Sequence, residues 1–170
     1  MRYLITLPWM PYPATDGGKQ GSFNMLMELQ NMIDITLIYP VFFKKQMACQ
    51  YLLEKQLPKV KVYPFEYYKN KDGIKSQYSL FRLHRIITRK FLKQPYLATP
   101  IYKDAYIDFV NEIIKKDRID IVQNEYFEQL YMVYAIPNTV KKVFIQHEIQ
   151  YIAKERLFQQ REYPSSVRYL

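Results

Sequence analysis

Three of the four glycines of this 170-residue chain lie within one short stretch, at Gly17, Gly18 and Gly21. An apolar run and a proline-rich loop precede them, and a helix-forming segment follows. Backbone N–H groups at the start of a helix bind anions, and glycine lets a ligand approach them closely. We therefore predict that Gly17 and Gly18, with the neighbouring Lys19, bind a phosphate or another part of a substrate.

The same stretch argues against a dinucleotide cofactor. The NAD fingerprint places G-x-G-x-x-G in a tight turn directly after the first strand. Here Asp16 stands where the first glycine would be, and about ten residues separate the strand from the glycines. We expect no cofactor. The alternative to a binding loop is a plain helix-entry turn that uses glycine for its positive φ.

A histidine and two glutamates follow two predicted strands. His147 and Glu148 come directly after the apolar run 141–146, and Glu125 follows the run 119–123. An imidazole titrates near neutral pH, and carboxylates accept hydrogen bonds from sugar hydroxyls or act as bases. We predict a catalytic role for His147 and substrate contacts for Glu125 and Glu148. The alternatives are a structural histidine and acids that complement helix dipoles.

A second group of candidates lies on a predicted helix at 77–93. At about 100° per residue its basic side chains form one narrow stripe bordered by bulky apolar residues. Such a face suits an anionic membrane surface, and the alternative is an ordinary solvated face of a core-packed helix. The stripe consists of Arg82, Arg85, Arg89 and Lys93.

The net charge of +9 is carried by the middle of the chain. Residues 41–103 contain 14 Lys and Arg against 3 Asp and Glu, whereas the rest has 11 against 13. This asymmetry indicates a local anionic partner. Because no helix-turn-helix, zinc-binding or RNA-binding signature is present, we expect that partner not to be nucleic acid. No residues have metal-ligand spacing, so we expect no metal.

Other features concern the compartment. Cys49 is the single cysteine, so no intrachain disulfide can form. The N-terminus lacks the pattern of a signal peptide, and no apolar run approaches the roughly 20 residues of a membrane span. We expect a cytoplasmic protein that is at most peripheral at the inner face of the membrane.

Apolar runs alternate with helical segments along the chain, which predicts one α/β domain over 1–170. We expect a doubly wound, Rossmann-like parallel sheet with helices on both faces and the strand order 3-2-1-4-5. Ligands of such sheets bind beyond the carboxyl ends of the strands, here between strands 1 and 4. The predicted strands are 2–7, 33–39, 59–63, 119–123 and 141–146, and the predicted helices are 20–31, 44–57, 77–93, one from Thr99-Pro100, 125–135 and 148–162.

The order and spacing of three stretches resemble those of family 4 (group 1) glycosyltransferases, which have the GT-B fold. The family's opening strand, glycine loop, helix and second strand resemble PWMPYPATDGGKQGSFNMLMEL…IDITLIYP. Its fourth strand resembles DIVQNEYFEQ, and its "xHNxEY" segment resembles KKVFIQHEIQYIAKER, with Glu148 in place of the asparagine. The resemblance covers most of residues 1–160.

This resemblance implies half of a two-domain enzyme. The N-terminal domain would bind a sugar or lipid-linked acceptor, and a second domain would bind a nucleotide-sugar. Transfer to a hydroxyl would retain configuration and need no metal. Gly17, Gly18 and Lys19 would approach the donor diphosphate or the acceptor, and His147 would lie near the transferred sugar. We expect the donor-binding domain to be absent from this chain and residues 1–170 to be inactive alone.

Two other functions remain open. One is a non-catalytic Rossmann-like module that binds an anionic ligand. The other is a basic protein that binds a membrane surface without any sugar chemistry.

Overall fold

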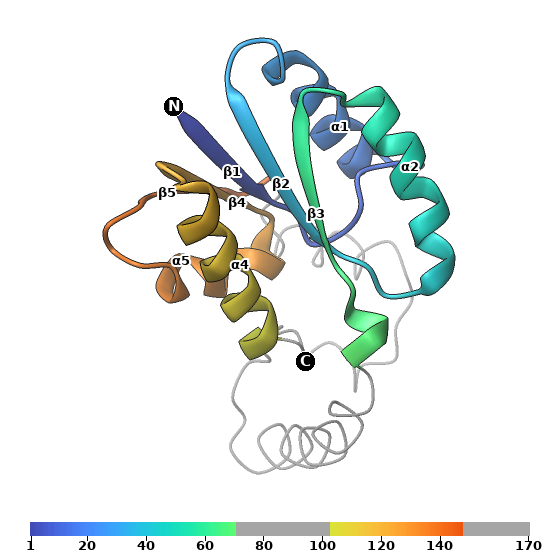
Figure 1. Ribbon diagram of the computed structural model, residues 1–170. Helices are drawn as coiled ribbons and strands as arrows, with labels where there is room; N and C mark the ends of the chain where they lie inside the picture. The colour runs from blue at the N-terminus through green and yellow to red at the C-terminus, as the bar shows by residue number, and fades with distance from the viewer. Residues whose placement is uncertain (71–102, 148–170) are drawn as a thin grey trace, which may run out of the picture.

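A five-stranded sheet runs through the part of the chain that the computed structural model describes, residues 1–70 and 103–147. Its order is β3-β2-β1-β4-β5, and every neighbouring pair is parallel (Figure 1). This confirms the α/β fold and the doubly wound order predicted from the sequence. The strands are β1 (Arg2–Thr6), β2 (Asp34–Pro40), β3 (Val60–Phe65), β4 (Ile121–Glu125) and β5 (Lys141–Ile145).

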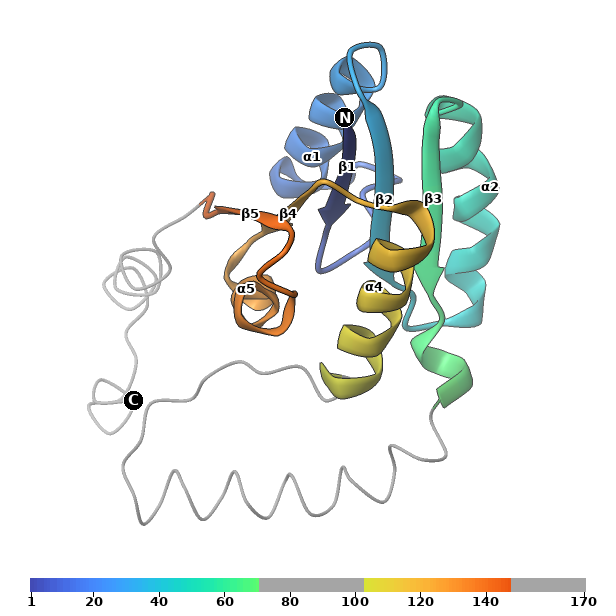
Figure 2. The same ribbon diagram turned by 60° about the vertical axis from the view of Figure 1, so that its left-hand side comes forward.

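Helices cover both faces of this sheet, as expected (Figure 1, Figure 2). One face carries α1 (Gly17–Leu29) and α2 (Met47–Gln56), and the other carries α4 (Lys103–Asp117) and α5 (Leu130–Ala135). Short 3-10 turns complete the described elements: η1 (Lys44–Gln46), η2 (Tyr67–Asn70) and η3 (Phe127–Gln129).

Successive residues of the central strands supply two separate cores. In β1, Ile5 joins the core beneath α1 and α2, whereas Leu4 joins the core beneath α4 and α5. Strands buried on both faces need apolar residues at nearly every position, which is why β2 reads as a continuous apolar run. The apolar side of α4 packs into this second core through Tyr106, Val110, Ile113 and Ile114.

Two element boundaries differ from the prediction in ways that shape the site. α1 begins at Gly17 because Asp16 caps it, so the glycines belong to its first turns and not to a preceding loop. The predicted helix 125–135 begins later, because β4 continues to Glu125 and η3 intervenes before α5. The predicted helices at 77–93 and 148–162, and the predicted helix start at Thr99-Pro100, lie outside the described residues.

The strand order changes direction between β1 and β4, and we call the carboxyl ends of these two strands the switch point of the sheet. β1 pairs with β2 on one side and with β4 on the other. The connections after β1 and β4 therefore leave in opposite directions, and a ligand crevice forms between them in folds of this kind. The segments that follow β1, β4 and β5 are positioned to build it.

Candidate functional site

A cavity of about 480 Å³ lies at this switch point. Its volume falls within the range of about 300–1,000 Å³ that is usual for small-molecule sites. We call it the switch-point pocket. Three segments that are distant in sequence form its lining: Trp9, Asp16, Gly17, Gly18 and Gly21, then Tyr126, Phe127 and Glu128, then Gln146 and His147.

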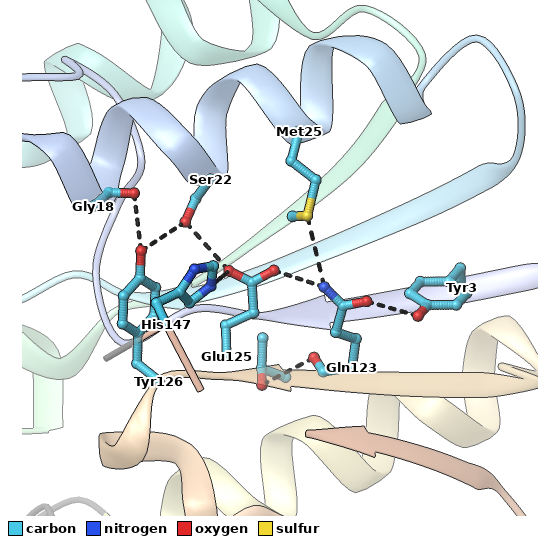
Figure 3. A network of polar contacts seen from close by, with 9 residues as sticks. Tyr3, Gly18, Ser22, Met25, Gln123, Glu125, Tyr126 and His147 are labelled. Carbon is cyan, nitrogen blue, oxygen red and sulfur yellow. Dashed lines mark hydrogen bonds and ion pairs between the residues drawn. The ribbon is translucent and has the colours of Figure 1, made fainter. Parts of the chain in front are cut away.

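Glu125, the last residue of β4, is completely buried beneath this pocket and accepts hydrogen bonds from three sides (Figure 3). Gln123 Nε2 donates to its Oε1 over 2.6 Å, and Ser22 Oγ donates to its Oε2 over 3.3 Å. His147 Nε2 lies 3.1 Å from the same Oε2. These contacts offset the cost of removing a carboxylate from water. They also join α1, β4 and the end of β5.

The orientation of the Gln123 amide is set by Tyr3. The Tyr3 hydroxyl donates to Gln123 Oε1 over 2.7 Å, which directs Gln123 Nε2 at Glu125. Burial, followed by the charge of Glu125, raises the pKa of the Tyr3 hydroxyl, so Tyr3 remains a donor at neutral pH. The Glu125 carboxylate is therefore held by a side chain that is itself held in place.

His147 presents one ring nitrogen to Glu125 and one to its surroundings. A carboxylate only accepts hydrogen bonds, so a neutral imidazole bonded to it through Nε2 carries its proton there. The other nitrogen, Nδ1, is then an acceptor. The side chain is 37% exposed and lines the pocket, so Nδ1 is the nitrogen left for a ligand hydroxyl.

Tyr126 forms the aromatic wall of the pocket. Its ring stacks on the His147 ring with centroids 4.3 Å and planes 24° apart, and it packs against Trp9 at 4.6 Å. Its hydroxyl donates to the carbonyl oxygen of Gly18 over 2.9 Å. The rings of Trp9, Tyr126 and Phe127 give the pocket an apolar surface.

The backbone of Tyr126 is strained, with φ 68° and ψ 153°. This region is occupied almost only by glycine, and a side chain there costs about 1–3 kcal/mol. The contacts with Trp9, His147 and Gly18 hold the residue in place. Such strain is concentrated at functional sites, where it directs one side chain to one place.

Of the three glycines of α1, only Gly18 lies where a side chain would meet a neighbour. None of the described glycines has a positive φ. The alternative that the glycines provide a positive φ at the helix entry is therefore wrong. A Cβ on Gly18 would lie 3.2 Å from the Tyr126 hydroxyl and 3.6 Å from the Trp9 ring. A Cβ on Gly17 or Gly21 would meet nothing within 4 Å.

We expect Gly18→Ala to be less stable than Gly17→Ala by about 1 kcal/mol. Alanine is favoured over glycine in a helix by about 0.5–1 kcal/mol, and Gly17→Ala should keep much of that gain. In Gly18→Ala the new methyl group would press on Tyr126, which cannot move aside because Trp9 and His147 pack on it. Urea unfolding of the two variants measures the difference, and equal stabilities would contradict the tight approach at Gly18.

Asp16 closes the N-terminus of α1. Its backbone is extended, and its Oδ1 accepts the Lys19 backbone N–H over 2.9 Å. This hydrogen bond, ahead of other causes, lowers the pKa of Asp16 below its usual value, so the carboxylate is charged at neutral pH. The Lys19 ammonium lies 3.2 Å from Asp16 Oδ2 and 3.1 Å from Thr15 Oγ1. Lys19 is thus paired with the cap and is not among the described lining residues.

The structure brings together some of the predicted site residues. Gly17, Gly18 and His147 line one pocket. Glu125, for which we predicted substrate contacts, is wholly buried and is not among the lining residues, because its side chain contacts Ser22, Gln123 and His147. The remaining predicted residues, Glu148, Arg82, Arg85, Arg89 and Lys93, lie outside the described part of the chain.

Sequence reasoning missed Trp9, Ser22 and Tyr126. Tyr126 directly follows β4 and Trp9 follows β1, so the rule that placed Gly17 and His147 at the switch point could also have found these two rings. Ser22 gave no such signal. It is a small buried residue on the inner side of α1, and only the fold shows that it faces Glu125.

The described residues show neither a metal cluster nor a membrane span. No group of three or more His, Cys, Asp or Glu side chains there could hold a metal ion. Within residues 1–70 and 103–147, no helix has both the length and the apolar character needed to span a bilayer. No family model, curated protein or solved structure matches the chain.

Proposed function

We propose that this chain is the N-terminal, acceptor-binding domain of a glycosyltransferase. The complete enzyme would move a sugar from a nucleotide-sugar to a hydroxyl acceptor, and a second domain would hold most of the donor. The observation that carries the proposal is the switch-point pocket, in which an aromatic wall stands beside a histidine held by a buried glutamate. The resemblance of the chain to family 4 glycosyltransferases supports the same function.

The chemistry of the lining suits a sugar. The rings of Trp9, Tyr126 and Phe127 can stack against the C–H face of a pyranose. The carboxylates of Asp16 and Glu128 can accept hydrogen bonds from its hydroxyls. Small-molecule sites commonly combine apolar walls with a few placed polar groups in this way.

His147 would contact the reacting hydroxyl. With Nε2 committed to Glu125, its Nδ1 accepts the hydroxyl proton, and the carboxylate stabilises the imidazolium that forms. The resemblance implies retention of configuration without a metal. Transfer also requires donor and acceptor to be held together, so we expect no transfer by these 170 residues alone.

Sugar titration monitored by tryptophan fluorescence tests this proposal. Trp9 is the single tryptophan of the chain, so its emission reports directly on the pocket. We expect one or more methyl glycosides from a panel of common hexoses to change that emission with millimolar affinity, as expected for ligands of this size. His147→Ala should weaken binding by about tenfold through loss of one hydrogen bond to the ligand.

The matched control for His147→Ala is Tyr134→Ala. Tyr134 is 85% exposed and lies outside the switch-point pocket, so this variant should bind like the wild type. If no glycoside changes the emission of Trp9 while inorganic phosphate does, the sugar-binding proposal is wrong. The alternative, a module for an anionic ligand, would then be favoured.

A location at the cytoplasmic face of a membrane is the second part of the proposal. It is supported by the basic sequence stripe Arg82, Arg85, Arg89 and Lys93, since each basic residue near an anionic surface contributes about 1 kcal/mol. Replacing the three arginines by Glu should lower binding to phosphatidylserine vesicles by roughly a hundredfold or more in a flotation assay. Replacing Lys115, Lys116 and Lys141 by Glu changes the net charge equally and should leave most of the binding intact. Equal losses in both variants would exclude the stripe as the docking face.

A further inference from the structure

The charges around the switch-point pocket do not match an anionic ligand. The described residues that line it include the carboxylates of Asp16 and Glu128 and no lysine or arginine. The nearest cation at the α1 start, Lys19, is bound to Asp16 and Thr15. Among residues 1–70 and 103–147, no free cation stands at this position, so a phosphate there would approach like charges.

The N-terminus of α1 is already capped by a side chain of the protein, that of Asp16. The Asp16 carboxylate takes the position that an anion holds at a helix N-terminus, because its Oδ1 accepts the Lys19 N–H over 2.9 Å. The surfaces of Gly17 and Gly21 remain open, since nothing lies within 4 Å of a Cβ at either position. A ligand can thus lie against α1 while the carboxylate keeps other anions away from its amides.

We propose that Asp16 is a specificity-determining residue, which closes the α1 N-terminus to phosphate and leaves the switch-point pocket to groups that carry no negative charge. That such a group is a sugar follows only from the proposed function, on which that part rests. The exclusion of phosphate does not depend on the proposed function. In a complete enzyme the donor diphosphate is then bound by groups outside this pocket.

The variant Asp16→Asn separates charge from capping. Asparagine caps a helix about as well as aspartate, so α1 keeps its start, while the negative charge and its ion pair with Lys19 are lost. We expect this variant to bind inorganic phosphate at least about tenfold more tightly than the wild type. In ¹⁵N-resolved NMR spectra the amide signals of Gly17 and Gly18 should move on titration with phosphate.

Asp34→Asn is the matched control. It removes the same charge from an exposed residue at the start of β2, at the opposite end of the sheet. This variant should bind phosphate no better than the wild type. The inference is overturned if Asp16→Asn gains no affinity for phosphate, or if the wild type already binds phosphate at the Gly17 and Gly18 amides as tightly.

Titration with methyl glycosides distinguishes this inference from the proposed function. If Asp16→Asn gains phosphate binding but no glycoside binds the wild type, Asp16 is confirmed as the residue that excludes anions and the glycosyltransferase proposal fails. If a glycoside binds but Asp16→Asn gains no affinity for phosphate, the proposed function stands and the inference about Asp16 is wrong.

Discussion

Replacing Glu125 by Ala should lower the free energy of unfolding by about 3 kcal/mol, since breaking a buried network leaves its donors without an acceptor. The Gln123 amide and the Ser22 hydroxyl are both buried and would lose the oxygen that they contact. The side chain removed is fully buried, so a small cavity is added to the loss. The midpoint of thermal unfolding should fall by roughly 6–12 °C.

Two further variants make this result specific to the network. Glu125→Gln keeps the volume and one acceptor oxygen, so it should cost about 1 kcal/mol. Glu28→Ala removes an exposed glutamate from α1 and should change stability by no more than about 0.5 kcal/mol. Circular dichroism during urea unfolding measures all three. A Glu125→Ala protein as stable as Glu28→Ala would show that the buried contacts contribute nothing.

The second large effect is expected at Tyr126. Truncation to Ala removes a ring that packs on both Trp9 and His147, and such losses cost about 3 kcal/mol. It should also abolish glycoside binding, because the pocket loses its aromatic wall and the ring that holds His147 in place.

Substitution of Tyr126 by Gly separates strain from packing. At most positions a Gly variant is less stable than an Ala variant. At φ 68° and ψ 153° the order should reverse, so Tyr126→Gly should be more stable than Tyr126→Ala by about 1 kcal/mol. Tyr126→Phe keeps the ring and loses the hydroxyl contacts with the Gly18 carbonyl and with Ser22 Oγ, so it should cost about 1 kcal/mol. Urea unfolding compares the three variants, and an Ala variant more stable than the Gly variant would contradict the strained backbone.

Much of the fold could be predicted from the sequence because its signals are local and repeated. The apolar run IDITLIYP marks a strand buried on both faces, and the spacing of Tyr106, Val110 and Ile113 marks one side of a helix. Where strands and helices alternate along a chain, the right-handed connection between parallel strands allows few strand orders. The element ends were less accurate. The Asp16 side chain sets the start of α1 and the pairing with β5 sets the end of β4, and no periodicity reveals either.

The site could be predicted only where position alone decides. Gly17, Gly18 and His147 were found because they follow strands that meet at one edge. The partner of His147 was not found: substrate contacts were predicted for Glu125, whereas its side chain contacts His147. That pairing depends on the register of β4 against β5, in which Glu125 stands opposite Ile145, two residues before the histidine.

The topology also has a consequence for how the domain assembles. β1 pairs with β2 about thirty residues away, but its pairing with β4 joins Tyr3 to Ile121 and closes a far longer loop. Contacts of such long sequence separation form slowly. The β1-β2-β3 half should therefore become structured first, and the docking of β4 should complete the molecule. Trp9 meets Tyr126 only in that last event, so its fluorescence during refolding should report the moment at which the protein becomes able to bind anything at all.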